Sequence, residues 1–344
     1  MVGIIIGKIF RYAVNYVIAT EFNSDILGFF VFGLVLIRAG SIIGSFGLRT
    51  ASQRIIAVTV NQCNKNKLVG STTLILTIPL FTGSITSFVL YYFWPLIHQQ
   101  LGLGVSLNVR IFFFAIPLFS FMMVGATATR GFKHTKYYIY IREVGQSGTA
   151  LILISITSYI IVNEKLLFHS YFLSLIFGCV LTFVFLRRLG ALKFDIRPLF
   201  DIKGLLTIST PLMIVSSSQY LISWTDVLMI GTLMNSPDVG YYHVAFIFAS
   251  SLFMIFQAIN AIFPSIVAEQ FAGGDIKMIE NHYKSVTKWG TYFTLFGLVV
   301  LILYSKLLLG QFGFEYTVAS NTLIMLAIGT SLASITGPNS FILS

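Results

Sequence analysis

The chain has 344 residues, of which 56% are hydrophobic and only 10% are charged, and its mean hydropathy is +0.87. A soluble domain carries roughly 25% charged residues, so this composition excludes a chain that covers a water-facing surface. The formal net charge is +10, which raises the question of an acidic partner such as nucleic acid.

Apolar segments long enough to cross a membrane recur along the whole chain. A helix of about 20 mostly apolar residues spans roughly 30 Å of hydrocarbon and satisfies its own backbone hydrogen bonds, as lipid requires. We therefore predict an all-α fold, a polytopic transmembrane helical bundle. The predicted spans lie at residues 3–20, 25–45, 69–93, 108–126, 145–163, 169–186, 205–233, 240–264, 287–305 and 320–336.

Lys and Arg are concentrated in alternate connections between these spans. Sixteen of the 22 lie in residues 46–68, 127–144, 187–204 and 265–288. Cytoplasmic loops carry the excess of Lys and Arg, so we expect a cell-membrane protein with both termini in the cytoplasm. The positive net charge then reflects topology and contact with anionic lipid, and nucleic acid is not expected as a partner.

A short motif occurs twice, once before the second span and once before the eighth. Asn23-Ser-Asp-Ile-Leu-Gly-Phe-Phe30 is echoed by Asn235-Ser-Pro-Asp-Val-Gly-Tyr-Tyr242, with Gly28 matching Gly240. Six helices separate the two copies, and an even number keeps them parallel. The echo predicts two pseudo-repeated lobes: residues 1–203 with six helices and residues 204–344 with about four.

Motifs of catalysis and metal binding are not found. The five His residues have no ligand spacing, and Cys63 and Cys179 are predicted to lie in different compartments of the topology. No phosphate-binding loop, nucleophile elbow or metalloprotease motif is present. We expect no enzyme, no catalytic residue, no metal site and no cofactor, and any transport would be coupled to an ion (H⁺ or Na⁺) or to lipid, or would be passive.

Charged and polar side chains form stripes on four of the predicted spans. Such stripes face a bundle interior or a wet cavity, because facing lipid is costly. Asp226 is the only acidic residue that the prediction places within a span. The stripes comprise Lys8, Arg11 and Asn15; Arg38, Ser41 and Ser45; Ser216, Gln219, Ser223 and Asp226; and His243, Ser250 and Gln257.

The charge within the spans is in surplus on the positive side. Lys8, Arg11 and Arg38 cannot all pair with the single carboxylate of Asp226, and each would cost about 2.5–3.5 kcal/mol to insert facing lipid. A cavity that they line would attract an anion, and the fork of Arg fits phosphate oxygens. We predict these three cations as substrate-binding residues. The predicted cavity-lining or gating residues are Asn15, Gln219, Ser223, Asp226 and Gln257.

Other roles stay open for several of these residues. Lys8 lies near the chain start, so its side chain could snorkel to the interface. Arg38 and Asp226 could form a structural bridge, and Asp226 could instead act in coupling or bond to a neighbouring helix. Arg130 and Lys133, after the fourth span, are either a topology signal or contacts to a phosphate headgroup.

Several motifs, in this order, resemble those of polysaccharide-type lipid-linked oligosaccharide flippases. These flippases belong to the multidrug/oligosaccharidyl-lipid/polysaccharide exporter superfamily. The resemblance covers nearly the whole chain. It rests on Ala128-Thr-Arg-Gly-Phe-Lys-His-Thr-Lys-Tyr137, Asp226 followed by Ile230-Gly231, Asp238-Val-Gly-Tyr-Tyr-His-Val-Ala245, Ala261-Ile-Phe-Pro-Ser-Ile-Val-Ala-Glu-Gln270 with Gly274-Asp275, Tyr283-Lys-Ser-Val-Thr-Lys-Trp289 and Phe312-Gly-Phe-Glu-Tyr316.

The resemblance implies two lobes around a cationic cavity and transport by alternating access. The expected cargo is a polyprenyl-phosphate-linked glycan, exported for cell-surface polysaccharide biosynthesis, with membrane lipids and a glycan polymerase or ligase as further candidate partners. Such flippases usually have twelve or more spans. The ten predicted here imply a second lobe that stops after its fourth helix, as expected of a fragment.

Two other functions remain as alternatives. A multidrug or small-metabolite antiporter of the same superfamily would carry cationic drugs through an acidic cavity, whereas the cavity predicted here is basic. A membrane glycan polymerase or ligase would need a large external loop with catalytic residues. The longest outward connection predicted here, residues 95–108, holds a single histidine, His98.

Overall fold

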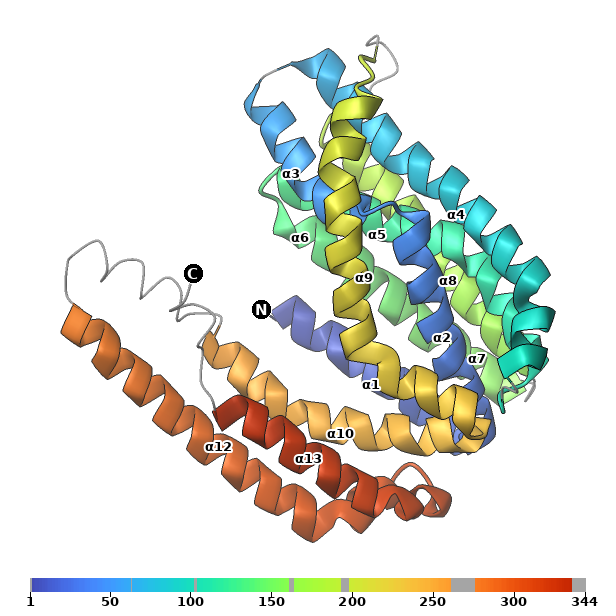
Figure 1. Cartoon of the computed structure of the whole chain (residues 1–344), viewed down its shortest axis with the longest axis vertical. Coiled ribbons are helices and arrows are strands. Elements are labelled where there is room, and N and C mark those ends of the chain that lie inside the picture. Colours follow the sequence, from blue (N-terminus) through green and yellow to red (C-terminus); the bar gives the residue numbers. More distant parts are fainter. Residues whose placement is uncertain are drawn as a thin grey trace. The chain divides into compact units, whose positions relative to one another are not determined.

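The protein is helical throughout the part of the chain that the computed structural model describes, residues 2–62, 64–101, 104–160, 164–192, 198–260 and 276–335 (Figure 1). These residues contain no strand, so the all-α prediction is confirmed. Among the elements named below, η1 and η3 are 3₁₀ helices and η2 is a π-helix. The elements are α1 (Val2–Glu21), α2 (Ser24–Gly44), α3 (Leu48–Asn61), α4 (Lys65–Leu101), η1 (Leu107–Ala115), α5 (Ile116–Gly131), α6 (Thr135–Tyr138), η2 (Ile139–Gln146), α7 (Ser147–Ile160), α8 (Glu164–Arg188), α9 (Ile202–Leu233), α10 (Ser236–Asn260), α12 (Ile276–Gly310), η3 (Phe314–Ala319) and α13 (Ser320–Ile335).

The chain divides into two compact units, Met1–Gly240 and Tyr241–Ser344. The first unit holds α1 to α9 and the first residues of α10, and the second holds the rest of α10 with α12, η3 and α13. Packing therefore groups α9 with α2 and α3. The predicted lobe boundary at residue 204 rests on the sequence repeat and not on packing, and it stays a prediction.

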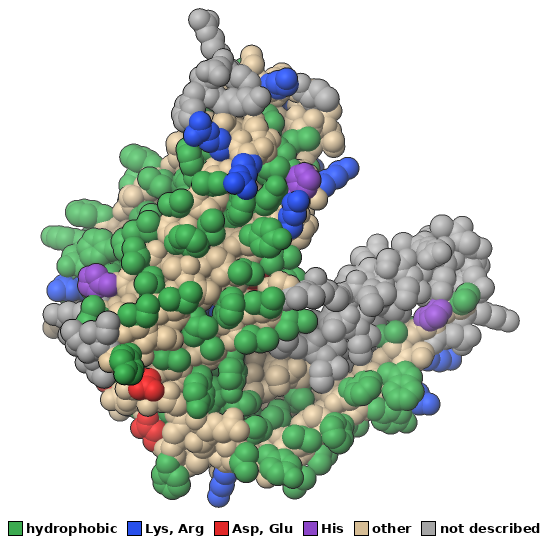
Figure 2. Space-filling view, turned by 180° about the vertical axis from the view of Figure 1, so that it is seen from behind, with side chains coloured by type: hydrophobic (Ala, Val, Ile, Leu, Met, Phe, Trp, Pro, Cys, Tyr) green, Lys and Arg blue, Asp and Glu red, His purple; other side chains and the backbone are tan. Residues whose placement is uncertain are grey.

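In the part of the chain that the structure describes, each of the ten predicted spans falls on a helical segment. Among the described residues, six helices are long and apolar enough to cross a membrane by length and composition alone. The remaining four predicted spans correspond to α1, which carries Lys8 and Arg11, to α10, and to α7 and α13, which have only 14 and 16 residues. Hydrophobic side chains are spread over the visible face of the first unit, with Lys and Arg gathered toward one end (Figure 2). The chain is thus a multi-pass membrane protein.

Residues 46–68 were expected to be a connection, but most of them are helical. In α3, Leu48, Ala51, Ile55 and Ile56 are buried at helical spacing, while Arg54 on the opposite face is exposed. The buried face packs against α5 and α9. Hydropathy missed this element because an amphipathic helix of 14 residues has neither the length nor the apolar run of a span.

Residues 127–144 were also expected to be a cytoplasmic loop, and here too the prediction was wrong. The chain forms α6 and then the π-helix η2, which continues directly into α7. Stretches of π-helix are rare and often occur at functional sites. In this structure η2 buries Ile141 and Glu143 against its neighbours, so an acidic residue that the prediction left in a loop lies inside the first unit.

Within the first unit, the Ser24–Gly28 part of the first motif copy lies against the Ser236–Gly240 part of the second. Any Cβ added to Gly28 would collide with the backbone carbonyl of Ser236, and one added to Gly240 would collide with the carbonyl of Ser24. Each glycine therefore meets the serine of the other copy, which is the reciprocity that a local two-fold axis produces. Close approach of α2 and α10 explains why both copies have glycine at this position.

Candidate functional site

Glu143 is a buried ion-pairing residue at the centre of η2. Its side chain is 4% exposed, and its Oε2 lies 2.7 Å from Nη1 of Arg11 on α1, while its Oε1 lies 3.4 Å from Nη1 of Arg142. Arg11 also donates a hydrogen bond to Ser147 at 3.4 Å. Gly7, one turn before Arg11, leaves room for this carboxylate, since a Cβ there would lie 2.6 Å from Oε2. Arg11 is thus neutralised by an acid.

Two further cations meet at the ring of Tyr138. Arg142 donates a hydrogen bond to the Tyr138 hydroxyl, and the Arg130 guanidinium lies 3.5 Å from the ring centroid. Nε of Arg130 is buried without a hydrogen-bond partner among the described residues. The ring face compensates a cation only in part. We refer to Arg11, Arg130, Tyr138, Arg142 and Glu143 together as the Glu143 cluster.

Arg38, on α2, has an aromatic partner in place of an acidic one. Its Cζ lies 4.8 Å from the ring centroid of Trp224 on α9, and within the described chain it makes no ion pair. The proposed bridge from Arg38 to Asp226 is therefore not formed. Oδ1 of Asp226 instead accepts a hydrogen bond from the backbone N–H of Val227 at 2.8 Å.

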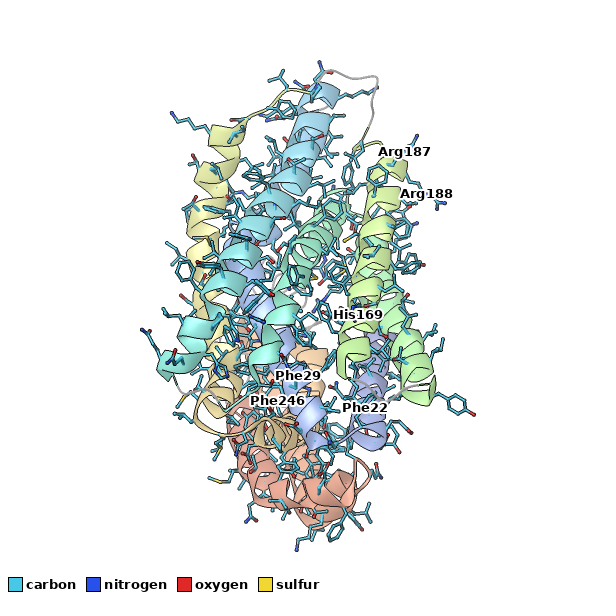
Figure 3. All side chains as sticks on the ribbon, turned by 90° about the vertical axis from the view of Figure 1, so that its right-hand side faces the viewer. Phe22, Phe29, His169, Arg187, Arg188 and Phe246 are labelled. Atoms are coloured by element: carbon cyan, nitrogen blue, oxygen red, sulfur yellow. The ribbon has the colours of Figure 1, made fainter. Side chains whose placement is uncertain are left out.

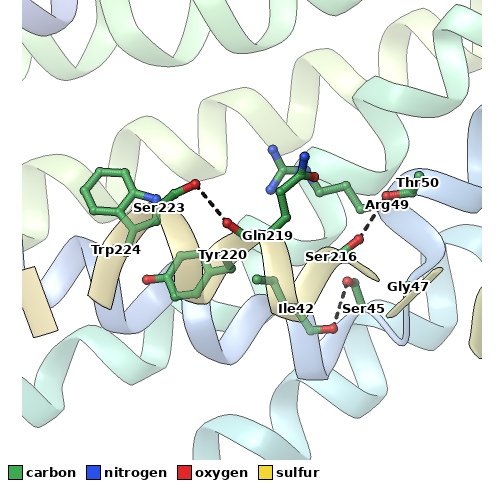
Figure 4. Close-up of a pocket in the computed structure, with 10 residues that line it drawn as sticks. All are labelled: Ile42, Ser45, Gly47, Arg49, Thr50, Ser216, Gln219, Tyr220, Ser223 and Trp224. Carbon is green, nitrogen blue, oxygen red and sulfur yellow. Dashed lines mark hydrogen bonds between the residues drawn. The ribbon is translucent and has the colours of Figure 1, made fainter. Parts of the chain in front are cut away.

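A cavity of about 370 Å³ opens between α2, α3 and α9, beside Trp224 (Figure 4). Hydroxyl and amide groups dominate its polar lining, and Arg49 supplies the charge. Two of the hydroxyls, on Thr50 and Ser216, lie 3.2 Å apart and connect α3 to α9. We call it the Arg49 cavity; it is lined by Ile42, Ser45, Gly47, Arg49, Thr50, Ser216, Gln219, Tyr220, Ser223 and Trp224.

The positive charge of Arg49 is costly in this position. Burial, together with the nearby positive charges of Arg142, Arg38 and Arg130, lowers the pKa of Arg49 to about 10, and Tyr138 partly offsets this shift. A group with this pKa is still a cation at neutral pH. The cavity therefore presents a charge that neighbouring cations destabilise, and an anion bound there would relieve that repulsion.

The structure separates the predicted site residues into several places. Gln219 and Ser223 line the Arg49 cavity. Asn15 donates its amide to the backbone carbonyl of Arg11 at 2.7 Å, and Lys8 lies within electrostatic range of Arg11 and Glu143.

The remaining predicted residues lie elsewhere. Of the two proposed headgroup contacts, Arg130 is folded onto Tyr138, whereas Lys133 is exposed at a left-handed backbone position with φ +63°. Asp226 does not line the Arg49 cavity. Gln257 is on α10, and its side chain is outside the described residues. In the described part of the chain, no group of three or more His, Cys, Asp or Glu could hold a metal ion.

Sequence reasoning missed two important residues, Arg49 and Glu143. Arg49 was counted only as a topology signal, because a basic residue next to a span usually is one. Glu143 had a usable signal: it is the only acid in residues 127–144, it directly follows Arg142, and apolar residues flank the pair. Had Ile139–Gln146 been predicted as a helix, Glu143 would have been predicted to face the interior of the bundle.

Comparisons with known proteins give one partial family match and several solved structures of similar fold. The MatE family model matches residues 211–343. An inward-facing conformation of a multidrug resistance MATE family transporter of the MOP superfamily is 15% identical, with 96% of this chain and 80% of that chain covered and a TM-score of 0.64. A MATE in complex with MaD3S is 16% identical, with 100% and 82% covered and a TM-score of 0.59. None of the curated proteins matches the sequence.

These similarities are distant, and they agree with one another. The structural likeness extends over nearly the whole chain, and the family match falls on most of the segment predicted as the second lobe. The specific resemblance to oligosaccharide flippases is not confirmed. The chain therefore has the helical fold of MATE transporters.

Proposed function

We propose that the chain exports an anionic amphiphile, a lipid-linked oligosaccharide whose phosphate groups bind in the Arg49 cavity of the first unit. The observation that carries this proposal is the uncompensated positive charge at the cavity. Arg49 lines it directly, and Arg38 does not line it but contacts the ring of Trp224, which does. The phosphate role predicted for Arg11 passes to Arg49, because Glu143 already neutralises Arg11.

The surplus of cations favours an anionic cargo over a neutral one. Glu143 is the only acid among the described residues that is almost fully buried, and it pairs with Arg11 and Arg142. Arg38, Arg49 and Arg130 have no carboxylate within ion-pair distance in the described chain. A phosphate brings several acceptor oxygens, which match a forked guanidinium and the hydroxyls of Ser45, Thr50 and Ser216.

The cavity also has a size and an opening that suit part of a larger molecule. Ligand sites commonly enclose about 300–1,000 Å³, so 370 Å³ would hold a headgroup and leave a lipid tail and a glycan outside. A glycan polymerase or ligase as a partner, and H⁺ or Na⁺ as a coupling ion, remain part of the proposal.

Substitution of the two cavity cations tests this function. Arg49→Gln should weaken binding of a polyprenyl-diphosphate-linked oligosaccharide to the purified protein at least tenfold, since a charge-assisted hydrogen bond is lost. Arg38→Gln should weaken it less, since Arg38 does not line the cavity and acts on the phosphate through its charge alone. In a strain without another exporter, the same variants should accumulate that lipid on the cytoplasmic side. Arg54→Gln, on the exposed face of α3, is the matched control and should bind as the unaltered protein does. Unchanged binding in both cavity variants would refute the proposal.

Export of drugs is the second candidate, because a solved structure of similar fold is described as a multidrug resistance transporter. A drug exporter would extrude a cationic dye such as ethidium from cells, and removal of Arg49 should then increase extrusion by reducing repulsion. Dye extrusion together with a lack of binding to the phosphate-bearing lipid would establish this candidate over the first.

A further inference from the structure

A second cavity, of about 280 Å³, lies in the first unit away from the Arg49 cavity. Its walls come from α2, α4, η1 and α8. Phe29 and Ser45, which line one cavity each, are sixteen residues apart along α2 and its end, or about 24 Å at 1.5 Å per residue. The residues that matter for its chemistry are Phe29, Tyr91, Asn108, Arg110, Phe114 and Phe168.

The cavity lies at the end of the spans that we predict to face outward. Phe29 lies near the start of α2, Tyr91 near the end of α4 and Phe168 near the start of α8. In Figure 3, Phe22 and Phe29 are far from Arg187 and Arg188, which mark the basic end of α8. By the distribution of Lys and Arg, the cavity is at the depth of the outward leaflet.

One side of the cavity offers two hydrogen-bond donors. Arg110 lies with its Cζ 5.1 Å from the ring centroid of Tyr91, and neither its guanidinium nor the side-chain amide of Asn108 has a hydrogen bond or ion pair in the described part of the chain. Stacking on a ring leaves the N–H groups at the guanidinium edge available. A cation and an amide that line the same cavity are suited to an anion with several oxygens.

The other side is apolar and continues into the surface that faces lipid. Phe29 and Phe168 are almost fully buried, whereas Phe114 is 51% exposed. On α4, next to Tyr91, Phe88 and Tyr92 are 72% and 71% exposed. Large apolar side chains with this exposure belong in hydrocarbon in a membrane protein. An occupant of the cavity would thus meet charge at one end and lipid at the other.

We propose that this cavity binds a lipid of the outward leaflet by its phosphate headgroup. Arg110 and Asn108 hold the phosphate, and the first carbons of the chain lie against Phe29 and Phe114. A bulk phospholipid and a polyprenyl phosphate carrier share this chemistry. The proposal does not depend on the cargo of the Arg49 cavity. A specific lipid site differs from a simple interfacial anchor: if Arg110 only anchored the helix at the membrane surface, it would need no particular headgroup.

Native mass spectrometry of the whole protein in a maltoside detergent tests the site. The probes are phosphatidylglycerol and a 55-carbon polyprenyl phosphate, titrated separately and then against each other. Arg110→Gln should weaken binding of the tighter probe about tenfold, and Asn108→Ala, an exposed change that leaves the helix intact, should weaken it severalfold. Arg54→Gln should bind as the unaltered protein does. Inorganic phosphate at millimolar concentration should not compete, since it has no chain.

The competition identifies the lipid: tighter binding of phosphatidylglycerol assigns a structural lipid, and tighter binding of the polyprenyl phosphate assigns the carrier. Either result supports the site. Three results would overturn it: equal affinity of Arg110→Gln and the unaltered protein, an equal loss in Arg54→Gln, or displacement of the lipid by inorganic phosphate. Since the assay uses neither glycan nor transport, its failure is distinct from a failure of the proposed function.

Discussion

Two regions of the first unit carry partly buried arginines, and they differ in how the positive charge is compensated. In the Glu143 cluster, a carboxylate that is 4% exposed lies 2.7 Å from Arg11, and Ser147 and Tyr138 take up further donors. At the Arg49 cavity, Arg38 has only the Trp224 ring, and Arg49 faces hydroxyls and open volume. In the first region a carboxylate compensates Arg11 and Arg142, whereas in the second no described carboxylate lies within ion-pair distance of Arg38 or Arg49.

The contrast teaches that a cation on a polar stripe is not by itself a binding residue. Arg11 and Arg38 lie on similar stripes of neighbouring helices, and their sequence surroundings do not distinguish them. What separates them is an acid on η2 that is far from both in the chain. We expect the ion pairs of the Glu143 cluster to raise the free energy of unfolding. We expect the unpaired arginines at the Arg49 cavity to lower it, because they are kept for binding.

The largest expected effect comes from removal of the shared acid. Glu143→Gln keeps the shape of the side chain but leaves Arg11 and Arg142 without their counter-charge, which should cost about 3 kcal/mol, at the low end for a broken buried pair because both cations are partly exposed. A lower thermal midpoint of the purified protein in detergent would measure it. The double variant Arg11→Gln with Glu143→Gln should recover part of the loss. A midpoint unchanged in the single variant would remove the distinction between the two regions.

Arg38→Met should have the opposite sign. Arg38 has no acidic partner in the described chain, so an apolar side chain of similar length removes a buried charge and should stabilise the protein by about 2 kcal/mol. The same change should weaken binding of a phosphate-bearing lipid. A higher thermal midpoint with lower affinity for the lipid is the expected pair of results. A lower midpoint would mean that the contact to Trp224 is worth more than the burial of the charge costs.

The pH dependence of anion binding should separate the regions further. Burial lowers the pKa of Arg49 to about 10, from 12.5 for an ordinary arginine, so its charge is lost as pH rises through about 10. Anion affinity should then fall about tenfold between pH 9 and 11. Stability should not fall with it, because the neutral form is the one that folding favours and the unfolded chain still holds the proton. Arg49→Lys should move the loss of affinity to lower pH, since lysine starts from about 10.4.

Much of the architecture was readable from the sequence, and the partners of its charges were not. Apolar length predicted ten spans, and six of the described helices are long and apolar enough to cross a membrane. The same rule hid α3, whose buried face of Leu48, Ala51 and Ile55 packs on protein. The same rule failed for Glu143, because a charged residue at the edge of an apolar run is usually assigned to a loop. Partners such as Arg11 and Glu143, 132 residues apart, become visible only once the helices are packed.

Substitution of Gly7 is the smallest change that we expect to disturb the ion pair between Arg11 and Glu143. A Cβ at this position would lie 2.6 Å from both Cβ and Oε2 of Glu143, so Gly7→Ala should push the carboxylate away from Arg11 without removing any charge. Crowding of this kind costs about 1–3 kcal/mol, and alanine returns up to about 1 kcal/mol through its helix propensity, so we expect a net loss of about 1 kcal/mol. Gly329→Ala is the matched control, because nothing lies within 4 Å of a Cβ there and only the gain in propensity should appear.

The Gly7→Ala variant is tested by two measurements together, its thermal midpoint and its affinity for a phosphate-bearing lipid. If the carboxylate is displaced, Arg11 becomes a partly uncompensated cation like Arg38, and the interior of the first unit becomes more positive. The thermal midpoint should then fall while the affinity for a phosphate-bearing lipid rises by a few fold. Arg11 would then resemble Arg38, which has no acidic partner in the described chain, and the methyl group added by Gly7→Ala would be the cause. A fall in both quantities would instead show that Gly7 serves only helix packing, and that Glu143 does not hold Arg11 back from an anion.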